Sequence, residues 1–351
     1  MSKFYPLRIL EIKKETANAV SVVFDIPPEY ADVFKFTAGQ YITIKKEFSG
    51  QEIRRAYSIC SAPTSNELRI AIKSVKNGKF SIFATTQLKE GDILEASRPE
   101  GKFLLKPSKN KAINYLGIAA GSGITPVMAM IKSALLEDSK SLFTLIYGNK
   151  TIADTIFKTE LDTLKNEFPT RFYIQYVCSR EQVEGALFGR IDKGNINFLT
   201  KNKFKETAFD TAFLCGPETM IDTAKETLIE NGFDPKNIHF ELFSTPVATD
   251  NKTISTFEGE SEITVIVDDD ETTFMMDTAA TILSSVLKEG IDAPYSCQGG
   301  ICSSCLAKIT EGKAVMDKNS ILTDTEVNDG FILTCQAHPT TEKITVDYDD
   351  V

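Results

Sequence analysis

Four cysteines near the end of the chain have the spacing of a metal centre. They form the pattern C-x4-C-x2-C, followed after a further 29 residues by a fourth cysteine: Cys297, Cys302, Cys305 and Cys335. This spacing is typical of a plant-type [2Fe–2S] cluster, in which four thiolates hold two irons. Because one loop supplies three of the ligands, it must fold tightly, and Gly299 and Gly300 permit this since they lack a Cβ atom.

A structural zinc site is the alternative for these cysteines. Zinc sites usually combine two C-x2–4-C pairs, whereas here three cysteines share one loop and the fourth is distant, which favours the iron–sulfur interpretation. The odd count of seven cysteines, without a signal peptide, does not fit a disulfide framework. The remaining cysteines lie in strand-like segments, and we interpret Cys60 and Cys178 as small buried hydrophobic residues.

A glycine-rich turn at residues 119–126 has the composition of a phosphate-binding loop. It reads Ala-Ala-Gly-Ser-Gly-Ile-Thr-Pro and lies between an apolar strand and a helical segment. Gly121 and Gly123 would let the backbone approach a pyrophosphate, and the helix N-terminus offers free N–H groups. Pro126 replaces the third glycine of G-x-G-x-x-G and suits a first helical turn. A plain tight turn is the alternative, but the strand–loop–helix context favours nucleotide binding.

Polar residues also follow three further strands of the same region. They are the segments Tyr147-Gly148-Asn149, Cys178-Ser179-Arg180 and Cys215-Gly216-Pro217. The carboxyl ends of parallel strands meet at one edge of a sheet, where open α/β sheets bind ligands. Arg180 and Ser179 can hold a 2′-phosphate there, although a lone arginine at a strand end is more often a solvated surface charge.

Two weaker motifs lie in the first hundred residues. One is Arg54-Arg55-Ala56-Tyr57-Ser58, and the other is Gly78-Lys79-Phe80-Ser81, which follows a strand and opens a helix that can cradle a phosphate. In the first motif, Arg55 and Tyr57 alternate on one strand face and Ser58 does not share it. Ser58 must therefore act through its backbone or from the end of the strand.

The elements that must position these motifs change in type along the chain. Short strands separated by Gly, Pro and Asn predict a closed antiparallel barrel over the first ~105 residues. From about 110 to 240, apolar runs alternate with helical segments, which predicts a parallel sheet with crossovers. A polar stretch over 245–261 reads as a linker. Beyond it, a strand over 262–267, a helix over 278–288 and a strand over 343–346 are expected.

Composition and charge limit the function further. Hydrophobic residues make up 42% and charged residues 25% of the 351 residues, which excludes wholesale disorder and a collagen-like chain. The net charge is −10, yet residues 262–351 alone hold 17 acidic and 5 basic residues. This acidic segment argues against nucleic-acid binding and suits docking on a basic surface. The alternative is a solvated acidic domain, which the charge alone does not distinguish from a docking module. No membrane-spanning run or signal peptide is present, so a cytoplasmic location is expected.

Taken together and in this order, the motifs resemble those of the ferredoxin–NADP reductase-like flavoprotein reductases that carry a C-terminal plant-type ferredoxin domain. The resemblance covers nearly the whole chain. It implies a multidomain fold: a flavin-binding antiparallel β-barrel over 1–108, an NAD(P)-binding α/β parallel-sheet domain over 109–244, a linker over 245–261, and a β-grasp α+β [2Fe–2S] ferredoxin domain over 262–351.

The resemblance also implies roles for individual residues. Two segments match the family's flavin-binding R-x-Y-S motif and pyrophosphate loop: Arg55, Ala56, Tyr57 and Ser58, and Gly78, Lys79, Phe80 and Ser81. The pyridine-nucleotide site is matched by Gly121, Gly123, Thr125, Cys215, Gly216 and Pro217, of which Thr125 and Cys215 are taken as catalytic. Ser179 and Arg180 match NADPH-preferring relatives, so NADPH is expected rather than NADH, although Lys150 stands where near relatives often have Arg. Glu241 and Phe243 match an E-x-F ending whose aromatic ring shields the flavin.

Electron counting gives the expected activity. NADPH gives two electrons as a hydride, whereas a [2Fe–2S] cluster accepts one at a time, and a flavin can store the pair and release it singly. By resemblance the flavin is FAD rather than FMN, and the acceptor is a partner oxygenase component. The alternatives are a stand-alone reductase of ferredoxin or flavodoxin type, the reductase of another ring-hydroxylating oxygenase, and a non-catalytic iron–sulfur module.

Overall fold

A computed structural model gives the structure of this chain. It describes residues 3–108, 111–243 and 259–351. Contacts divide the chain into two compact units. One unit holds Tyr5–Ile53 and Tyr57–Phe243, and the other holds the C-terminal segment together with the N-terminal residues up to Phe4 and with Arg54–Ala56.

Six strands form the first sheet, in the order β4-β3-β6-β1-β2-β5. Their bounds are β1 (Phe4–Thr16), β2 (Ala19–Asp25), β3 (Tyr41–Phe48), β4 (Gln51–Ser58), β5 (Leu68–Lys73) and β6 (Ile93–Ser97). An antiparallel bridge between Ile59 and Ile70 joins the two edges of this order, so the predicted antiparallel barrel is confirmed. Alternating burial along β1, where Leu7 and Ile9 face the core, explains the alternation in the sequence. Helix α1 (Lys79–Thr86) follows β5, and the short helices η1 (Pro28–Tyr30) and η2 (Pro63–Ser65) lie in loops.

A second six-stranded sheet is parallel throughout, in the order β10-β9-β8-β7-β11-β12. Its strands are β7 (Asn114–Ala120), β8 (Leu142–Asn149), β9 (Phe172–Cys178), β10 (Leu187–Phe188), β11 (Thr211–Gly216) and β12 (Ile238–Leu242). The predicted parallel sheet is therefore confirmed, and the sequence missed β10 and β12. The central strands β7 and β8 are buried along nearly their whole length, which explains their unbroken apolar runs.

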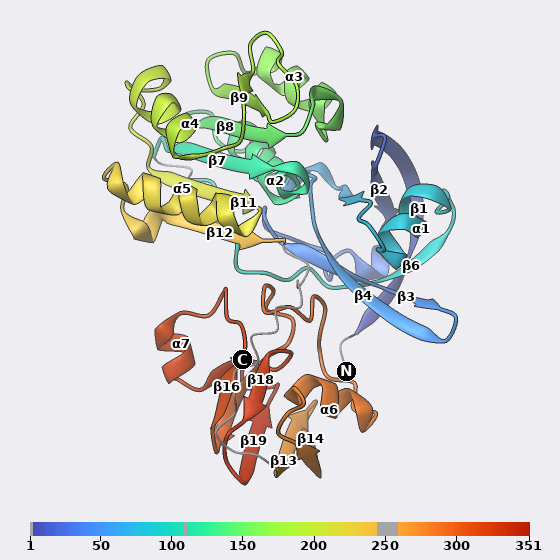
Figure 1. Ribbon diagram of the computed structural model, residues 1–351. Helices are drawn as coiled ribbons and strands as arrows, with labels where there is room; N and C mark the ends of the chain where they lie inside the picture. The colour runs from blue at the N-terminus through green and yellow to red at the C-terminus, as the bar shows by residue number, and fades with distance from the viewer. Residues whose placement is uncertain (1–2, 109–110, 244–258) are drawn as a thin grey trace. The chain divides into compact units, whose positions relative to one another are not determined.

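Helices connect these parallel strands and pack against them (Figure 1). The helices are η3 (Gly121–Gly123), α2 (Ile124–Leu136), η4 (Ile152–Asp154), α3 (Lys158–Glu167), α4 (Lys193–Phe198), the π-turn η5 (Leu199–Lys203), α5 (Glu218–Glu230) and η6 (Pro235–Asn237). Strands β7 and β11 are neighbours in the sheet. After β7 the chain adds β8, β9 and β10 on one side, and after β11 it adds β12 on the other side. The carboxyl ends of β7 and β11 therefore flank the switch point of the sheet, where such folds bind ligands.

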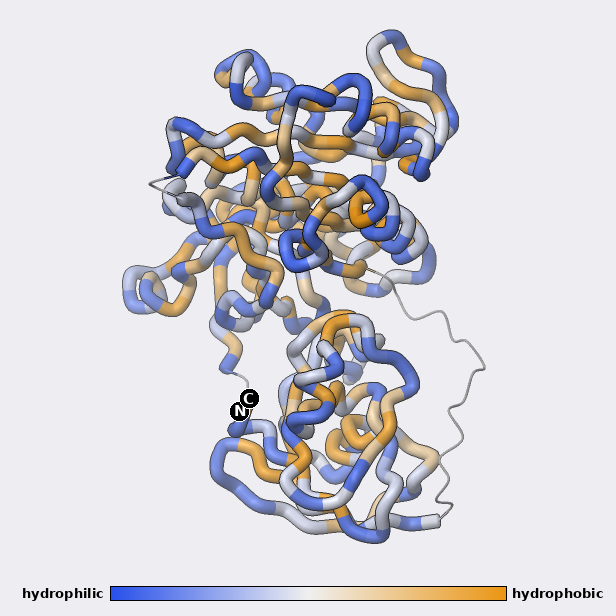
Figure 2. Tube along the Cα trace, turned by 90° about the vertical axis from the view of Figure 1, so that its left-hand side faces the viewer, coloured by the Kyte–Doolittle hydropathy of each residue, from blue (hydrophilic) through white to orange (hydrophobic). Residues whose placement is uncertain are grey.

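The C-terminal unit is built on a mixed five-stranded sheet, in the order β14-β13-β19-β15-β17. Its strands are β13 (Glu260–Val267), β14 (Asp270–Asp277), β15 (Leu306–Glu311), β17 (Phe331–Leu333) and β19 (Lys343–Asp347), with β16 (Ala314–Met316) and β18 (Ala337–Pro339) as a separate pair. Helix α6 (Ile282–Lys288) packs against β14 and β18, and α7 (Asp324–Asn328) against β17. This arrangement is the expected β-grasp fold. Hydrophobic and hydrophilic residues alternate in short stretches along the chain trace (Figure 2).

Two expectations for this region need adjustment. Residues 245–258 of the expected linker lie outside the described part of the chain, and Glu260 and Ser261 belong to β13 rather than to a linker. The helix expected from residue 278 begins at Ile282, because Thr281 caps it by accepting a hydrogen bond from the Ser284 amide. No helix in the described ranges has the length and apolar character needed to cross a membrane.

Candidate functional site

The fold brings the four predicted cluster cysteines together. Hydrogen-bond contacts link the Cys297 thiol to Cys302 and Cys335, and the Cys305 thiol to Cys335. All four are free thiols. Cys305 directly precedes β15, whereas Cys335 lies between β17 and β18, and β15 pairs with β17. The pairing of β15 with β17 explains how Cys335, which is distant in the sequence, reaches the loop that holds the other three cysteines.

The loop around these cysteines is folded by two left-handed residues. Gly300 has φ +69°, and a Cβ atom there would lie 2.8 Å from the Lys318 carbonyl oxygen. The other left-handed residue is Gln298, with φ 53°, whose carbonyl accepts a 3.2 Å hydrogen bond from Gln336. The prediction that glycine permits the tight fold is confirmed for Gly300, but the second special conformation belongs to Gln298 and not to Gly299.

Amide groups point at the sulfur of Cys297. The Gly299 amide donates to the Cys297 Sγ at 3.3 Å, and the Ile301 amide also donates to it. Hydrogen bonds from Cys302 and Cys335 are the main cause that lowers the pKa of the Cys297 thiol, and these amides add to the effect. Four converging thiols with amide donors to sulfur are the surroundings that a [2Fe–2S] cluster requires. The thiol contacts are pairwise, and in the described ranges no group of three or more His, Cys, Asp or Glu side chains is arranged to hold a single metal ion.

The glycine-rich loop lies where the sequence predicted, between β7 and α2. Gly121 has φ +56° and needs the freedom of glycine. A Cβ atom on Gly123 would lie 2.2 Å from the Cys215 carbonyl oxygen, so Gly123 is required by close contact with β11. Thr125 is buried, and its hydroxyl donates a 3.0 Å hydrogen bond to the Ser122 carbonyl. The loop thus brings Thr125 and Cys215, the two predicted catalytic residues, to one part of the sheet edge.

The other strand ends meet at the same edge. Ser179 and Arg180 follow β9, and their amides donate to the Asn149 and Lys150 carbonyls at 3.0 and 2.9 Å. The Arg180 side chain is exposed, as is Lys150. Gly216 ends β11, and Pro217 is the N-cap residue of α5. The predicted nucleotide residues therefore share the carboxyl edge of the sheet.

Ser58 contacts a residue that the sequence assigned only weakly. It is the last residue of β4 and is buried, and its hydroxyl donates a 3.3 Å hydrogen bond to Glu241 Oε2. Glu241 lies on β12 in register with Cys215 on β11. Burial raises the pKa of the Glu241 carboxyl to about 8, although Ser58 acts in the opposite direction. Burial and the nearby Glu241 raise the pKa of the Cys215 thiol.

The pyrophosphate motif opens α1 as predicted. Gly78 is its N-cap residue, and the Ser81 hydroxyl donates to the Gly78 carbonyl at 3.3 Å. The Phe80 ring is buried, with its centroid 5.7 Å from that of Tyr57. Phe80 can therefore reach a cofactor only through its backbone. The Lys79 ammonium and the amides of the first turn of α1 form a donor set that fits a flavin pyrophosphate.

Lys73 is a further basic residue that the sequence did not single out. It ends β5, and its Nζ would lie 3.6 Å from a Cβ atom on Gly121. Burial lowers the pKa of Lys73, while Asp154 raises it. A lysine at the end of a barrel strand carries no motif, so only the structure could place it over the nucleotide loop. An ammonium at this position fits an anionic nucleotide.

Comparisons with protein-family models match all three modules. An oxidoreductase FAD-binding domain matches residues 6–104, an oxidoreductase NAD-binding domain matches 118–226, and a 2Fe-2S iron-sulfur cluster binding domain matches 265–340. The first two cover the barrel and the parallel-sheet domain, and the third covers the cysteine loop.

Curated relatives match the whole chain. One component of the 1,2-phenylacetyl-CoA epoxidase of Escherichia coli (strain K12) is 35% identical over 99% of both chains. The ferredoxin reductase component of the 3-ketosteroid-9-alpha-monooxygenase of Rhodococcus rhodochrous is 30% identical over 97% of this chain and 96% of the relative. The solved phthalate dioxygenase reductase shares the fold, with a TM-score of 0.62 and 24% identity over 98% of each chain.

These matches agree with the geometry of the three modules. The barrel, the parallel sheet and the cysteine loop are matched by models for a flavin, a pyridine nucleotide and a [2Fe–2S] cluster, respectively. The chain belongs to the family of flavoprotein reductases that join FAD-binding, NAD-binding and [2Fe–2S] ferredoxin domains in one polypeptide, and it is an oxidoreductase that carries electrons between these cofactors.

Proposed function

We propose that this chain is the reductase component of an oxygenase of the phenylacetyl-CoA epoxidase type, in phenylacetate degradation. It passes electrons from NADPH through FAD and a [2Fe–2S] cluster to the oxygenase component. The observation that carries this proposal is the 35% identity to the E. coli epoxidase component, which extends over 99% of both chains. FAD, when bound, would supply the chemistry that links a two-electron hydride donor to a one-electron acceptor.

We assign the flavin to the barrel motifs. Arg55 is exposed and Tyr57 is half-buried on β4, and by the match to the family motif we assign both side chains to the flavin. Lys79 and the first turn of α1 supply charge and amide donors for the pyrophosphate. FAD would place its pyrophosphate at Lys79 and the first turn of α1, and for this reason we assign FAD rather than FMN.

We assign four residues to the position where a hydride would pass between nicotinamide and flavin: Thr125, Cys215, Ser58 and Glu241. Because the pKa of Glu241 is raised to about 8, its carboxyl holds a proton at neutral pH beside the Ser58 hydroxyl. Thr125 and Cys215 are held at the switch point by the contact of Gly123 with β11. Hydride transfer depends mainly on orientation, so these residues orient the nicotinamide and keep water away. Phe243 is exposed at the end of the described range, and its ring would shield a bound flavin.

We assign the preference between NADPH and NADH to the residues that follow the carboxyl ends of β8 and β9. We assign the exposed Arg180 guanidinium and the Ser179 hydroxyl to a 2′-phosphate, and the exposed Lys150 as a further cation, since the Arg180 amide donates to the Lys150 carbonyl. NADPH is therefore preferred over NADH.

The four cysteines of the C-terminal unit are assigned as the cluster ligands: Cys297, Cys302, Cys305 and Cys335. The acidic character of this unit suits docking on a basic face of the oxygenase. We place the protein in the cytoplasm, where the reducing environment keeps its seven thiols unpaired.

Reconstitution with the purified oxygenase component tests the proposal. The chain should bind FAD and iron, NADPH should bleach both chromophores, and phenylacetyl-CoA should be oxygenated only when reductase and oxygenase are combined. The 30% identical relative from a ketosteroid monooxygenase supports the second candidate, a reductase that serves another ring-hydroxylating oxygenase. Flavin and cluster reduction without any oxygenation of phenylacetyl-CoA would favour that candidate or a stand-alone reductase.

A further inference from the structure

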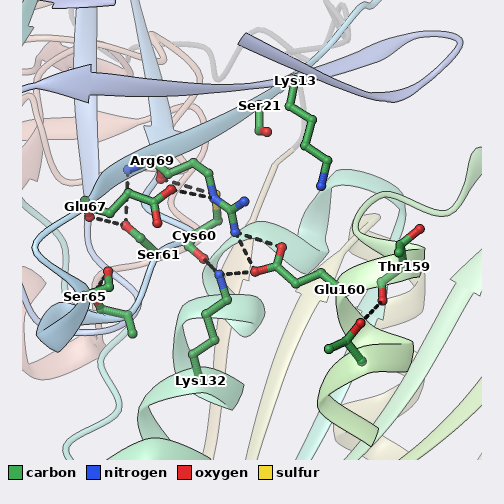
Figure 3. A network of polar contacts seen from close by, with 12 residues as sticks. Lys13, Ser21, Cys60, Ser61, Ser65, Glu67, Arg69, Lys132, Thr159 and Glu160 are labelled. Atoms are coloured by element: carbon green, nitrogen blue, oxygen red, sulfur yellow. Dashed lines mark hydrogen bonds and ion pairs between the residues drawn. The ribbon is translucent and has the colours of Figure 1, made fainter. Parts of the chain in front are cut away.

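A buried group of charges lies where the barrel meets the parallel-sheet domain, within one compact unit (Figure 3). Arg69 of β5 donates to both carboxylate oxygens of Glu160 on α3, each at 2.8 Å. The ammonium of Lys132 on α2 lies 2.6 Å from the same carboxylate. Glu160 therefore bridges one cation from the barrel and one from the nucleotide-binding domain.

These charges are too well covered to be an ordinary surface ion pair. The Arg69 and Lys132 side chains are each 10% exposed, and Glu160 is 25% exposed. Arg69 also lies 3.3 Å from Glu67 and has its guanidinium 5.4 Å from the centre of the Phe157 ring. Two cations thus face two carboxylates, which balances the buried charge, and removing one partner would leave an uncompensated charge in the interior.

The pKa of Glu160 reflects this balance. Burial alone would raise the pKa of the carboxyl, but the charges of Lys132 and Arg69 outweigh burial and lower it. Glu160 is therefore ionised at neutral pH, and both of its ion pairs are present under working conditions.

The group connects the two segments that carry the cofactor motifs. Lys132 Nζ donates a 3.3 Å hydrogen bond to the carbonyl of Cys60, which follows Ser58 by two residues. Cys60 in turn donates through its amide to the Arg69 carbonyl at 2.8 Å. Lys132 itself lies on α2, which begins directly after the nucleotide loop and carries Thr125 in its first turn, on the order of 10 Å along the helix from Lys132.

We propose that Glu160, with Lys132 and Arg69, sets the approach of the nicotinamide to the flavin by fixing α2 against the end of the flavin-binding strand. These are positioning residues, because none of them is part of the cofactor motifs. The proposal rests on the proposed function, since it presumes that flavin and nucleotide bind at their assigned sites.

The nucleotide loop has separate supports within its own domain, which gives the proposal a distinctive signature. The Tyr147 hydroxyl donates a 3.0 Å hydrogen bond to the Gly121 carbonyl, and Gly123 packs on Cys215. Loss of the Glu160 bridge should therefore leave nucleotide affinity nearly unchanged. The rate of hydride transfer should fall, because small misplacements of reacting groups cost up to about 10²-fold in rate.

Glu160→Gln in the full-length FAD-loaded protein tests this proposal by stopped-flow reduction of the flavin. At saturating NADPH we expect the flavin-reduction rate to fall about 10-fold or more, while the Kd for NADP⁺ changes less than about 2-fold. The matched control is Glu230→Gln, which removes the exposed ion pair with Lys193 in the same domain and should change neither value. Glu160→Asp keeps the charge and should recover part of the rate.

Hydrogen exchange on the FAD-free chain gives a readout without activity. Glu160→Gln should speed amide exchange in both α2 and the segment around Cys60, whereas Glu230→Gln should not. A wild-type rate of flavin reduction in Glu160→Gln, or a loss confined to nucleotide affinity, would overturn the proposal. If Glu160→Gln fails to fold, Lys132→Gln, which removes the cation of α2 from the bridge, decides by the same measurements. If the wild-type protein itself shows no reduction of flavin by NADPH, it is the proposed function that fails.

Discussion

Ser58 Oγ donates a hydrogen bond to Glu241 Oε2 at 3.3 Å, although 183 residues separate the two along the chain. Ser58 ends strand β4 of the barrel, and Glu241 belongs to the edge strand β12 of the parallel sheet. The contact therefore joins the two domains between which a hydride must pass. It also explains why Ser58 falls out of alternation with Arg55 and Tyr57, since it acts from the end of its strand.

Glu241→Gln should flatten the pH dependence of stability. The folded chain keeps the Glu241 proton up to about pH 8, whereas an unfolded chain releases it near the ordinary value of 4.5. Between these values the folded state binds more protons, so the contribution of Glu241 to stability decreases as pH rises. Thermal unfolding of both FAD-free proteins from pH 5 to pH 8.5 measures this. The melting temperature of the wild type, relative to that of Glu241→Gln, should fall with rising pH.

The same experiment has an internal control. Ser58→Ala leaves the carboxyl in place and removes a hydrogen bond that acts against the raised pKa, so the downward slope should persist. A wild-type slope that equals that of Glu241→Gln would contradict a raised pKa for this carboxyl.

Gly123→Ala should destabilise the nucleotide loop. The new methyl group would lie 2.2 Å from the Cys215 carbonyl oxygen, so the backbone of the loop or of β11 must move. Overpacking of this kind costs about 1–3 kcal/mol of unfolding free energy, and the shift should also weaken NADP⁺ binding. Denaturant unfolding and nucleotide titration measure both effects. Gly194→Ala is the matched control, because its nearest neighbour, a side-chain oxygen of Asp192, lies 3.3 Å away; equal behaviour of the two variants would refute this explanation.

Local patterns in the sequence predicted most of the fold. Alternating strands such as β1 and unbroken apolar strands such as β8 differ in whether one or both faces are buried, and this difference is visible in residue order. The short strand β10 and the half-polar strand β12 were missed. They lie at the two edges of the sheet. Edge strands are short and only partly buried, so their residues show no clear hydrophobic pattern.

Within the candidate site, motifs placed the loops but not their partners. The spacing of the cysteines predicted their convergence, because one loop and one β-pair are enough to produce it. The positions of Lys73 over Gly121 and of Glu160 between Lys132 and Arg69 depend on how separate elements pack. No local pattern encodes such contacts, so these residues could be found only in the structure.

Arg180→Ala should reduce the preference for NADPH. A charged hydrogen bond of this kind contributes about 1.5–3 kcal/mol, which corresponds to an increase of about 10- to 150-fold in the KM for NADPH. NADH lacks the 2′-phosphate, so its KM should change less than about 2-fold, and it serves as the control in the same preparation. Steady-state kinetics with both nucleotides measure the ratio. Equal losses with NADPH and NADH would show that Arg180 acts on the fold of the edge and not on the phosphate.

Cys302→Ser should separate the two halves of electron transfer. Cys302 contacts Cys297 in the thiol cluster, and loss of one of four ligands should abolish or strongly deplete the [2Fe–2S] absorbance. The flavin and nucleotide residues lie in other modules, so the rate of flavin reduction by NADPH should stay within about 2-fold of wild type. Iron analysis and stopped-flow spectra measure these values, while reduction of the oxygenase component should be lost.

Cys178→Ala is the control, because this buried thiol ends β9 in the nucleotide domain and its loss should leave the iron content unchanged. Full electron delivery by Cys302→Ser would mean that electrons leave the flavin without passing through the cluster.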